Sequence, residues 1–231
     1  MESNQKKAAD VGRYVSSLLR DHFGKGPASV HVLIKPPFAF IHLRDFLSPM
    51  ERILLKQQES KRLLELRDLL MDELRPQIKL NLWKLAGLDV TDVFADWNLE
   101  AETGMILCIL DEETAQETLA WPEGVSHEEV IKTINRASMK VEKRPGSTAV
   151  YWLNERTVLV VREKILVEIE KELIANGFTE PLKIAKRPLE RRSLELVDME
   201  TVLHHPIREV FVDWDFSGDT GYMVIMLETQ N

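Results

Sequence analysis

The chain has 231 residues, of which 44% are apolar and 29% are charged. These proportions are typical of a soluble globular protein, and they exclude a disordered or collagen-like chain. The net charge of −8 argues against non-specific binding to nucleic acids or anionic membranes, so we expect no nucleic-acid partner. The single cysteine, Cys108, excludes an intramolecular disulfide and a zinc site built from several cysteines.

The charged first residues are not followed by the apolar core that a signal peptide needs. The longest uncharged apolar stretch, residues 104–110, is too short to cross a bilayer. We therefore expect a cytoplasmic protein that is not embedded in a membrane, although association with the surface of a membrane complex is compatible with this pattern.

The first half of the chain predicts a helix, a strand hairpin, two helices and a second hairpin. Ser48, Pro49 and Glu51 form the signature of a helix start, with a cap, a proline in the first turn and an acidic residue at the third position. The other helices are expected at 7–22 and at 63–86, with a kink or break at Pro76, and the strands at 29–35, 38–44, 93–99 and 105–110. Apolar residues repeat along the long helix and predict a packed face: Leu63, Leu66, Leu70 and Leu74.

The second half predicts a similar series of elements. Its helices are expected near 127–139, 163–176 and 192–204, and its strands near 148–153, 157–162, 208–216 and 221–228. Each half is therefore expected to be an α-β-β-α-α-β-β two-layer sandwich, an α+β fold with helices on one face of an antiparallel sheet. We divide the chain into residues 1–111, an acidic linker at 112–126, and residues 127–231.

The two halves also resemble each other in sequence. Residues 93–110 and 210–227 align without a gap at an offset of 117, and seven of eighteen positions are identical. The identical residues include an Asp-Trp pair, Asp96-Trp97 and Asp213-Trp214, followed six residues later by Thr-Gly. We interpret the chain as a tandem repeat in which Trp97 and Trp214 anchor the two sheets. Such copies predict a monomer with pseudo-dimeric repeats, or a homodimer.

Two short motifs in the first half are familiar. Gly24-Lys25-Gly26-Pro27 lies between the opening helix and the first hairpin, and Leu47-Ser48-Pro49-Met50-Glu51 opens the next helix. With the closing hairpin they resemble the MpsC-like family of small bacterial proteins, long a domain of unknown function. The family is named after the accessory component of a sodium-translocating, membrane-potential-generating system. In the second half, Glu142 and Arg144 replace the two glycines, so this half is similar to a diverged member.

The resemblance implies an accessory or regulatory cytoplasmic protein of bacterial ion or inorganic-carbon physiology, with no catalytic residue and no cofactor. The expected function is binding of a protein partner or a small anion. For an anion the candidate residues are Gly24, Lys25 and Gly26, because a lysine between two glycines just after a helix leaves exposed backbone N–H groups beside a positive charge. The plainer alternative is that Gly24 ends the helix and Pro27 prevents its continuation.

The alternative function is a metal-dependent enzyme. Asp213, Asp215 and Asp219 resemble the start of a calcium-binding loop, but Val224 stands where the loop needs its glutamate. His31 and His42 can pair across the first hairpin and form a second metal candidate. The second half has Ala149 and Val160 in their places. In both cases a purely structural role, as a polar turn or a packing pair, is the competing interpretation.

Cys108 lies among apolar residues, so we expect a buried thiol rather than a nucleophile.

Overall fold

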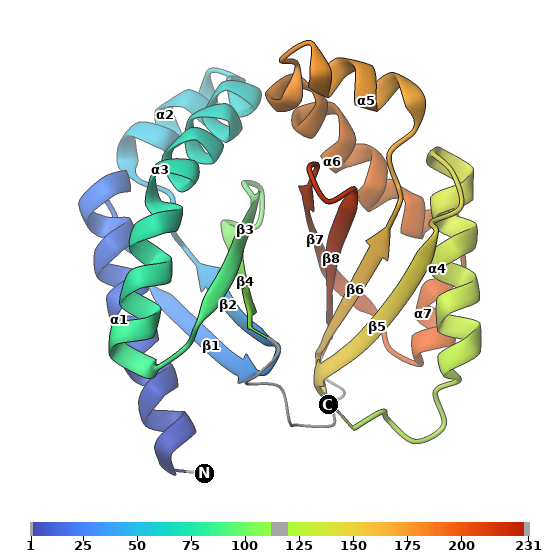
Figure 1. Cartoon of the computed structure of the whole chain (residues 1–231). Helices are drawn as coiled ribbons and strands as arrows, with labels where there is room; N and C mark the ends of the chain where they lie inside the picture. The colour runs from blue at the N-terminus through green and yellow to red at the C-terminus, as the bar shows by residue number, and fades with distance from the viewer. Residues whose placement is uncertain (1, 112–119, 229–231) are drawn as a thin grey trace. The chain divides into compact units, whose positions relative to one another are not determined.

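The computed structural model describes residues 2–111 and 120–228. The chain divides into two compact units, Met1–Thr118 and Leu119–Asn231, which are called here the first and the second unit. Each unit has a four-stranded antiparallel sheet with helices on one face (Figure 1). The predicted α+β class is therefore confirmed. Part of the predicted linker, residues 112–119, lies outside the described residues.

The first unit follows its predicted order of elements. Its helices are α1 (Glu2–Phe23), α2 (Pro49–Lys56) and α3 (Ser60–Ala86), and its strands are β1 (Ser29–Lys35), β2 (Phe38–Arg44), β3 (Val90–Asn98) and β4 (Thr103–Leu110). The strands pair in the order β1-β2-β4-β3. Helix α3 continues through Pro76, where the sequence predicted a kink or break.

The second unit has the same strand order and one more helix. Its helices are α4 (His127–Val141), α5 (Glu168–Ala175), α6 (Thr179–Glu195) and α7 (Met199–Leu203), and its strands are β5 (Ser147–Asn154), β6 (Thr157–Glu163), β7 (Ile207–Asp215) and β8 (Thr220–Leu227). The strands pair in the order β5-β6-β8-β7. The helix predicted at 163–176 is present as α5, but it begins later because β6 extends to Glu163. The helix predicted at 192–204 covers only the end of α6 and α7, so most of α6 was missed.

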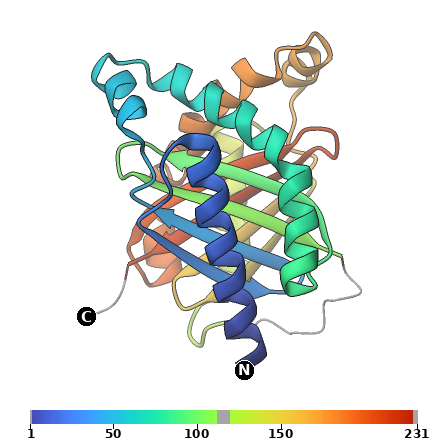
Figure 2. The same cartoon turned by 90° about the vertical axis from the view of Figure 1, so that its left-hand side faces the viewer.

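The core of each unit lies between its helices and its sheet. In the first unit α1 and α3 lie side by side over the sheet (Figure 2). Alternate residues of β2, such as Ala39, Ile41 and Leu43, are buried against them together with Cys108 of β4. The predicted burial of Cys108 is thus confirmed. Trp97 and Trp214, at 1% and 3% exposed, are part of the two cores, as the repeat predicted.

The hydrogen-bond ladders show which residues of the two units correspond. Leu43 lies opposite Gly104 in the first sheet, and Arg162 lies opposite Gly221 in the second. A register shift after Trp152 in β5 changes the offset between corresponding residues from 118 in β5 to 119 in β6. The offset of 119 continues into the next helices, since Glu51 and Glu170 both accept a hydrogen bond from the backbone N–H of the residue three positions earlier.

Candidate functional site

The two glycines beside Lys25 have structural explanations. Gly24 ends α1 with a φ of +78°, a left-handed conformation in which glycine carries no steric penalty. At Gly26 a side chain would place its Cβ 2.8 Å from the backbone oxygen of Ser16, so the glycine permits a close approach to α1.

Lys25 itself belongs to a small cluster of opposite charges. Its Nζ lies 2.8 Å from Oδ1 of Asp45, which also contacts Arg52 at 2.9 Å. Arg52 in turn binds Glu102 with both guanidinium ends. The hydrogen bond from Lys25 lowers the pKa of the Asp45 carboxyl. Because two cations meet two carboxylates here, an anion would have to compete with Asp45 for Lys25.

The corresponding place in the second unit has a different charge. Lys164 takes the position of Asp45. The backbone N–H of Asp45 donates to the carbonyl of Glu102, and that of Lys164 donates to the carbonyl of Asp219; in each unit the acceptor is the residue before the last strand. Lys143 donates to the backbone oxygen of Leu166 at 2.6 Å. On charge alone, the second unit therefore offers the more favourable surroundings for an anion.

His31 and His42 lie directly opposite each other in the β1–β2 pair, as the sequence predicted. His42 stacks on Phe40, with ring centroids 6.4 Å apart, on the sheet face away from the helices. The residue corresponding to His42 in the second unit is Val161 and not Val160, because the register shift in β5 moves the alignment by one position.

The three aspartates of the last hairpin each have a bond within the protein. Asp213 accepts a hydrogen bond from the backbone N–H of Trp214 at 2.9 Å, and Asp215 accepts two from Ser217. Asp219 accepts one from the backbone N–H of Leu166 at 2.7 Å. In residues 2–111 and 120–228 there is no group of three or more His, Cys, Asp or Glu side chains arranged to hold a metal ion. The metal site stays a prediction. Asp215 and Asp219 lie at the two ends of the turn, whereas Asp213 is buried within β7.

A buried ion pair in the first unit was not predicted from the sequence. Arg67 of α3, 1% exposed, lies 2.7 Å from Glu51 of α2. Its guanidinium lies over three aromatic rings, with distances to the ring centroids of 4.0 Å for Phe46, 4.4 Å for Trp97 and 4.6 Å for Phe23. Desolvation by burial lowers the pKa of Arg67 to about 10, which still leaves it charged at neutral pH.

Helices α2 and α3 expose large apolar side chains, and α3 exposes three of them near its end: Leu80, Trp83 and Leu85. Those of α2 and of the first half of α3 are called here the α2–α3 surface. Its members are Met50, Ile53, Leu66 and Leu69, with exposed fractions of 69%, 52%, 45% and 62%. The sequence placed Leu66 on a packed face, but only Leu63 and Leu74 of that series are fully buried. The leucine spacing did not predict the buried face of the helix correctly, because α3 has apolar residues on more than one side.

The corresponding residues of the second unit are less apolar. At the offset of 119, Ile53 corresponds to Glu172, Leu66 to Ala185 and Leu69 to Pro188. All three are exposed. Only Met50 keeps a large apolar counterpart, Ile169. The same helical framework therefore carries an exposed apolar surface in the first unit and a more polar one in the second.

None of the helices in the described parts of the chain is long and apolar enough to pass through a bilayer. Residues 3–112 match the model of a family described as the Na⁺-translocating membrane potential-generating system, MpsC. No curated protein and no solved structure matches the chain. The matched segment contains every helix and strand of the first unit except the beginning of α1, including the α2–α3 surface. The first unit is therefore similar to the MpsC family over residues 3–112.

Proposed function

We propose that this protein is an accessory component of a membrane-potential-generating system and that its α2–α3 surface binds a protein subunit of that system. The family description supports the first part of the proposal. The second part rests on one observation: four large apolar side chains are exposed on neighbouring helices of the unit that matches the family. Exposed apolar groups of this kind are typical of protein–protein interaction sites.

The second unit strengthens the proposal by comparison. We infer that it is a diverged copy of the first, because its sheet has the same strand order and its helices α5 and α6 correspond to α2 and α3. If the exposed apolar residues served only the fold, the copy would need them too. Glu172, Ala185 and Pro188 stand there instead, so the fold alone does not require apolar residues at these positions.

A protein partner is favoured over a small anion as the ligand of the first unit. The candidate anion site at Lys25 contains equal numbers of cations and carboxylates, and Lys25 is already bound to Asp45. By contrast, each apolar side chain of the α2–α3 surface is at least 45% exposed.

The test is physiological. The gene is deleted in the source organism, and the membrane potential is measured with a voltage-sensitive dye in sodium medium and in medium where potassium replaces sodium. The deletion is expected to lower the potential in sodium medium. Wild-type protein should restore it, whereas the double variant Leu66→Ser/Leu69→Ser should not, because it removes apolar area from the surface without touching the core.

The matched control is Ile169→Ser/Phe178→Ser, which changes two exposed apolar residues of the second unit. This variant is expected to restore the potential. An unchanged potential in the deletion strain would overturn the accessory role. Restoration by the Leu66/Leu69 variant at wild-type protein levels would overturn the assignment of the surface.

A further inference from the structure

The second unit replaces apolar core residues of the first by buried charges. Arg162 corresponds to Leu43 in the hydrogen-bond ladder, and Glu190 corresponds to Met71 along the helix at the offset of 119. Both replacements are fully buried, with exposed fractions of 1% and 0%.

A third replacement involves the buried cation itself. Lys186 corresponds to Arg67. Arg67 pairs with Glu51 and Lys186 with Glu170, and each of these glutamates also accepts a hydrogen bond from a backbone N–H at the start of its own helix, α2 or α5. The ring of Phe23, at the end of α1, covers Arg67. In the second unit Glu142, at the end of α4, binds Lys186 instead.

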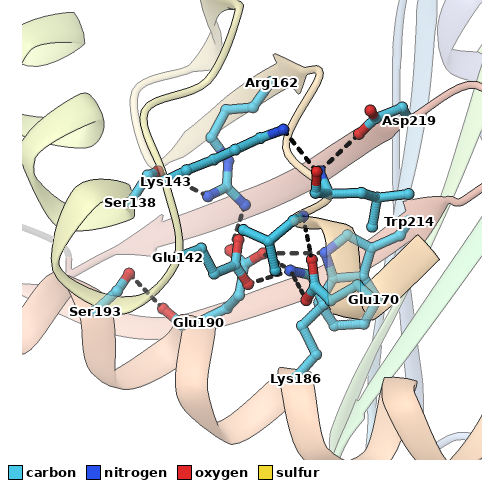
Figure 3. A network of polar contacts seen from close by, with 12 residues as sticks. Ser138, Glu142, Lys143, Arg162, Glu170, Lys186, Glu190, Ser193, Trp214 and Asp219 are labelled. Carbon is cyan, nitrogen blue, oxygen red and sulfur yellow. Dashed lines mark hydrogen bonds and ion pairs between the residues drawn. The ribbon is translucent and has the colours of Figure 1, made fainter. Parts of the chain in front are cut away.

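These residues form one continuous network (Figure 3). Arg162 binds Glu190 and donates to Ser138 at 3.0 Å. The ammonium of Lys186 faces three carboxylates: it binds Glu142, lies 2.9 Å from Glu170, and lies 3.7 Å from Glu190. The indole N–H of Trp214 donates to Glu190 at 3.0 Å.

The network contains one negative charge too many. Three carboxylates, Glu142, Glu170 and Glu190, meet two cations, Arg162 and Lys186. In the first unit one carboxylate, Glu51, meets one cation, Arg67. An uncompensated charge is costly in a desolvated site, so one carboxyl of the network favours its neutral form.

Glu142 is the carboxyl with the fewest donors. Glu190 has Arg162 and the Trp214 indole in addition to Lys186. Glu170 has the backbone N–H of Val167 in addition to Lys186. Glu142 has only Lys186 among the contacts of this network, and it lies at the carboxyl end of α4, where the helix dipole also disfavours a negative charge.

The electrostatics agree with this ranking. Burial, followed by the negative charge of Glu190, raises the pKa of Glu142 to about 7. Burial acts on Glu190 as well, but Arg162 and Lys186 outweigh it and lower the pKa of that carboxyl.

We propose that Glu142 is a buried proton-binding site that controls how firmly the end of α4 is held against α5 and α6. The charged groups that face it are Lys186 and Glu190 from α6, Glu170 from α5 and Arg162 from β6 (Figure 3). With Glu142 neutral, two carboxylates balance two cations and the helix end is held closed. With Glu142 ionised, the network carries a net negative charge and the helix end opens more often.

The direction of the pH effect follows from the raised pKa. A carboxyl that binds its proton more tightly in the closed state stabilises that state at low pH, and this stabilisation is lost as the pH rises from the value for an exposed carboxyl, 4.5, through about 7. If Glu142 becomes exposed on opening, the opening equilibrium is expected to increase about tenfold between pH 6 and pH 8.

Two measurements on the full chain test the proposal. The side-chain carboxyl carbons are followed by NMR between pH 4 and pH 9, with Glu142 assigned by the loss of its signal in Glu142→Gln. Hydrogen–deuterium exchange of peptides from the end of α4 is compared at pH 6 and pH 8 after correction for the intrinsic rates. We expect Glu142 to titrate near neutral pH, and protection to fall about tenfold in the wild type but not in Glu142→Gln.

Glu128→Gln is the matched control, because it removes the same charge from an exposed position of the same helix and should keep the wild-type pH dependence. If Glu142→Gln does not fold, Glu142→Phe removes the carboxyl and introduces an aromatic ring, like the Phe23 ring that covers the buried cation of the first unit. Titration of Glu142 below pH 5, or an equal pH dependence of exchange in the wild type and the Glu142 variant, would overturn the proposal.

Discussion

Trp97 lies directly opposite Gly104 in the β3–β4 pair, and a Cβ atom on Gly104 would lie 2.5 Å from Cε3 of the indole ring. Trp214 lies opposite Gly221 in the β7–β8 pair, where a Cβ atom would lie 2.7 Å from Cδ1 of Ile165 and 3.3 Å from Cδ1 of the indole ring. The ring of Trp97 therefore needs the space that a side chain on the opposite residue would fill. In the first unit this packing explains the glycine that stands seven residues after the tryptophan.

Gly104→Ala is expected to lower the free energy of unfolding by about 1–3 kcal/mol, because the added methyl group overpacks the core against Trp97. The measurement is urea unfolding followed by tryptophan fluorescence. Gly12→Ala is the control: its new Cβ would lie 3.5 Å from Val32, an ordinary contact, and alanine is about 0.5–1 kcal/mol better than glycine inside a helix. Equal unfolding midpoints for the two variants would contradict this packing.

Arg67→Ala is expected to lower the free energy of unfolding by about 3–5 kcal/mol, since it leaves Glu51 buried without its cation. Arg67→Lys should lose less, because a lysine fills the corresponding position as Lys186 and keeps the ion pair, although it lacks the flat guanidinium that stacks on aromatic rings. Urea unfolding measures both variants. An Arg67→Ala protein as stable as the wild type would show that the pair contributes nothing.

Val167→Ser is expected to stabilise the second unit by about 0.5–1 kcal/mol. Ser48, at the corresponding position, caps α2 with its hydroxyl, and Val167 has nearly the same backbone angles, −80° and 162° against −74° and 162°, but no side-chain acceptor. Ser48→Ala should cost about 1 kcal/mol. Thermal unfolding of both variants gives the comparison, and a destabilised Val167→Ser would mean that the valine side chain has a packing role that outweighs the cap.

Cys108 is expected to resist thiol reagents in the native protein. It is completely buried, and burial raises the pKa of its thiol to about 12, so the reactive thiolate is scarce at neutral pH. Mass spectrometry after incubation with iodoacetamide should show an unmodified chain, and full modification in urea. Rapid alkylation of the folded protein at pH 7 would refute this.

The parts of the fold that sequence predicted well are those in which local signals agree with burial. The bounds of β1 and β2 match the predicted strands, and Ser48 caps α2 as its motif indicated. Helix α6 was missed because Pro181 and Pro188 interrupt a highly charged stretch. Pro181 lies in the first turn, where a missing N–H breaks no helical hydrogen bond, and the helix tolerates Pro188 in its interior.

The buried charges could not be predicted from their local sequence. Lys186 and Glu190 are four residues apart, a spacing that on most helices marks an exposed ion pair. Arg67 follows Leu66 in a leucine-rich helix, where a charged residue is normally expected at the surface. Their burial depends on partners from distant elements, Arg162 of β6 and Glu51 of α2. The replacement of apolar core residues by charges becomes visible only when the two units are aligned, and this alignment requires the strand register of β5 and β6.

Site-specific photo-crosslinking in the source organism tests the proposed partner surface most directly. A photoreactive amino acid is placed at Leu66, or at Ala185, the corresponding exposed position of the second unit. The account predicts a crosslink from position 66 to a membrane-embedded subunit of the potential-generating system, and none to that subunit from position 185. Absence of the crosslink at position 66, or equal crosslinking from both positions, would contradict it.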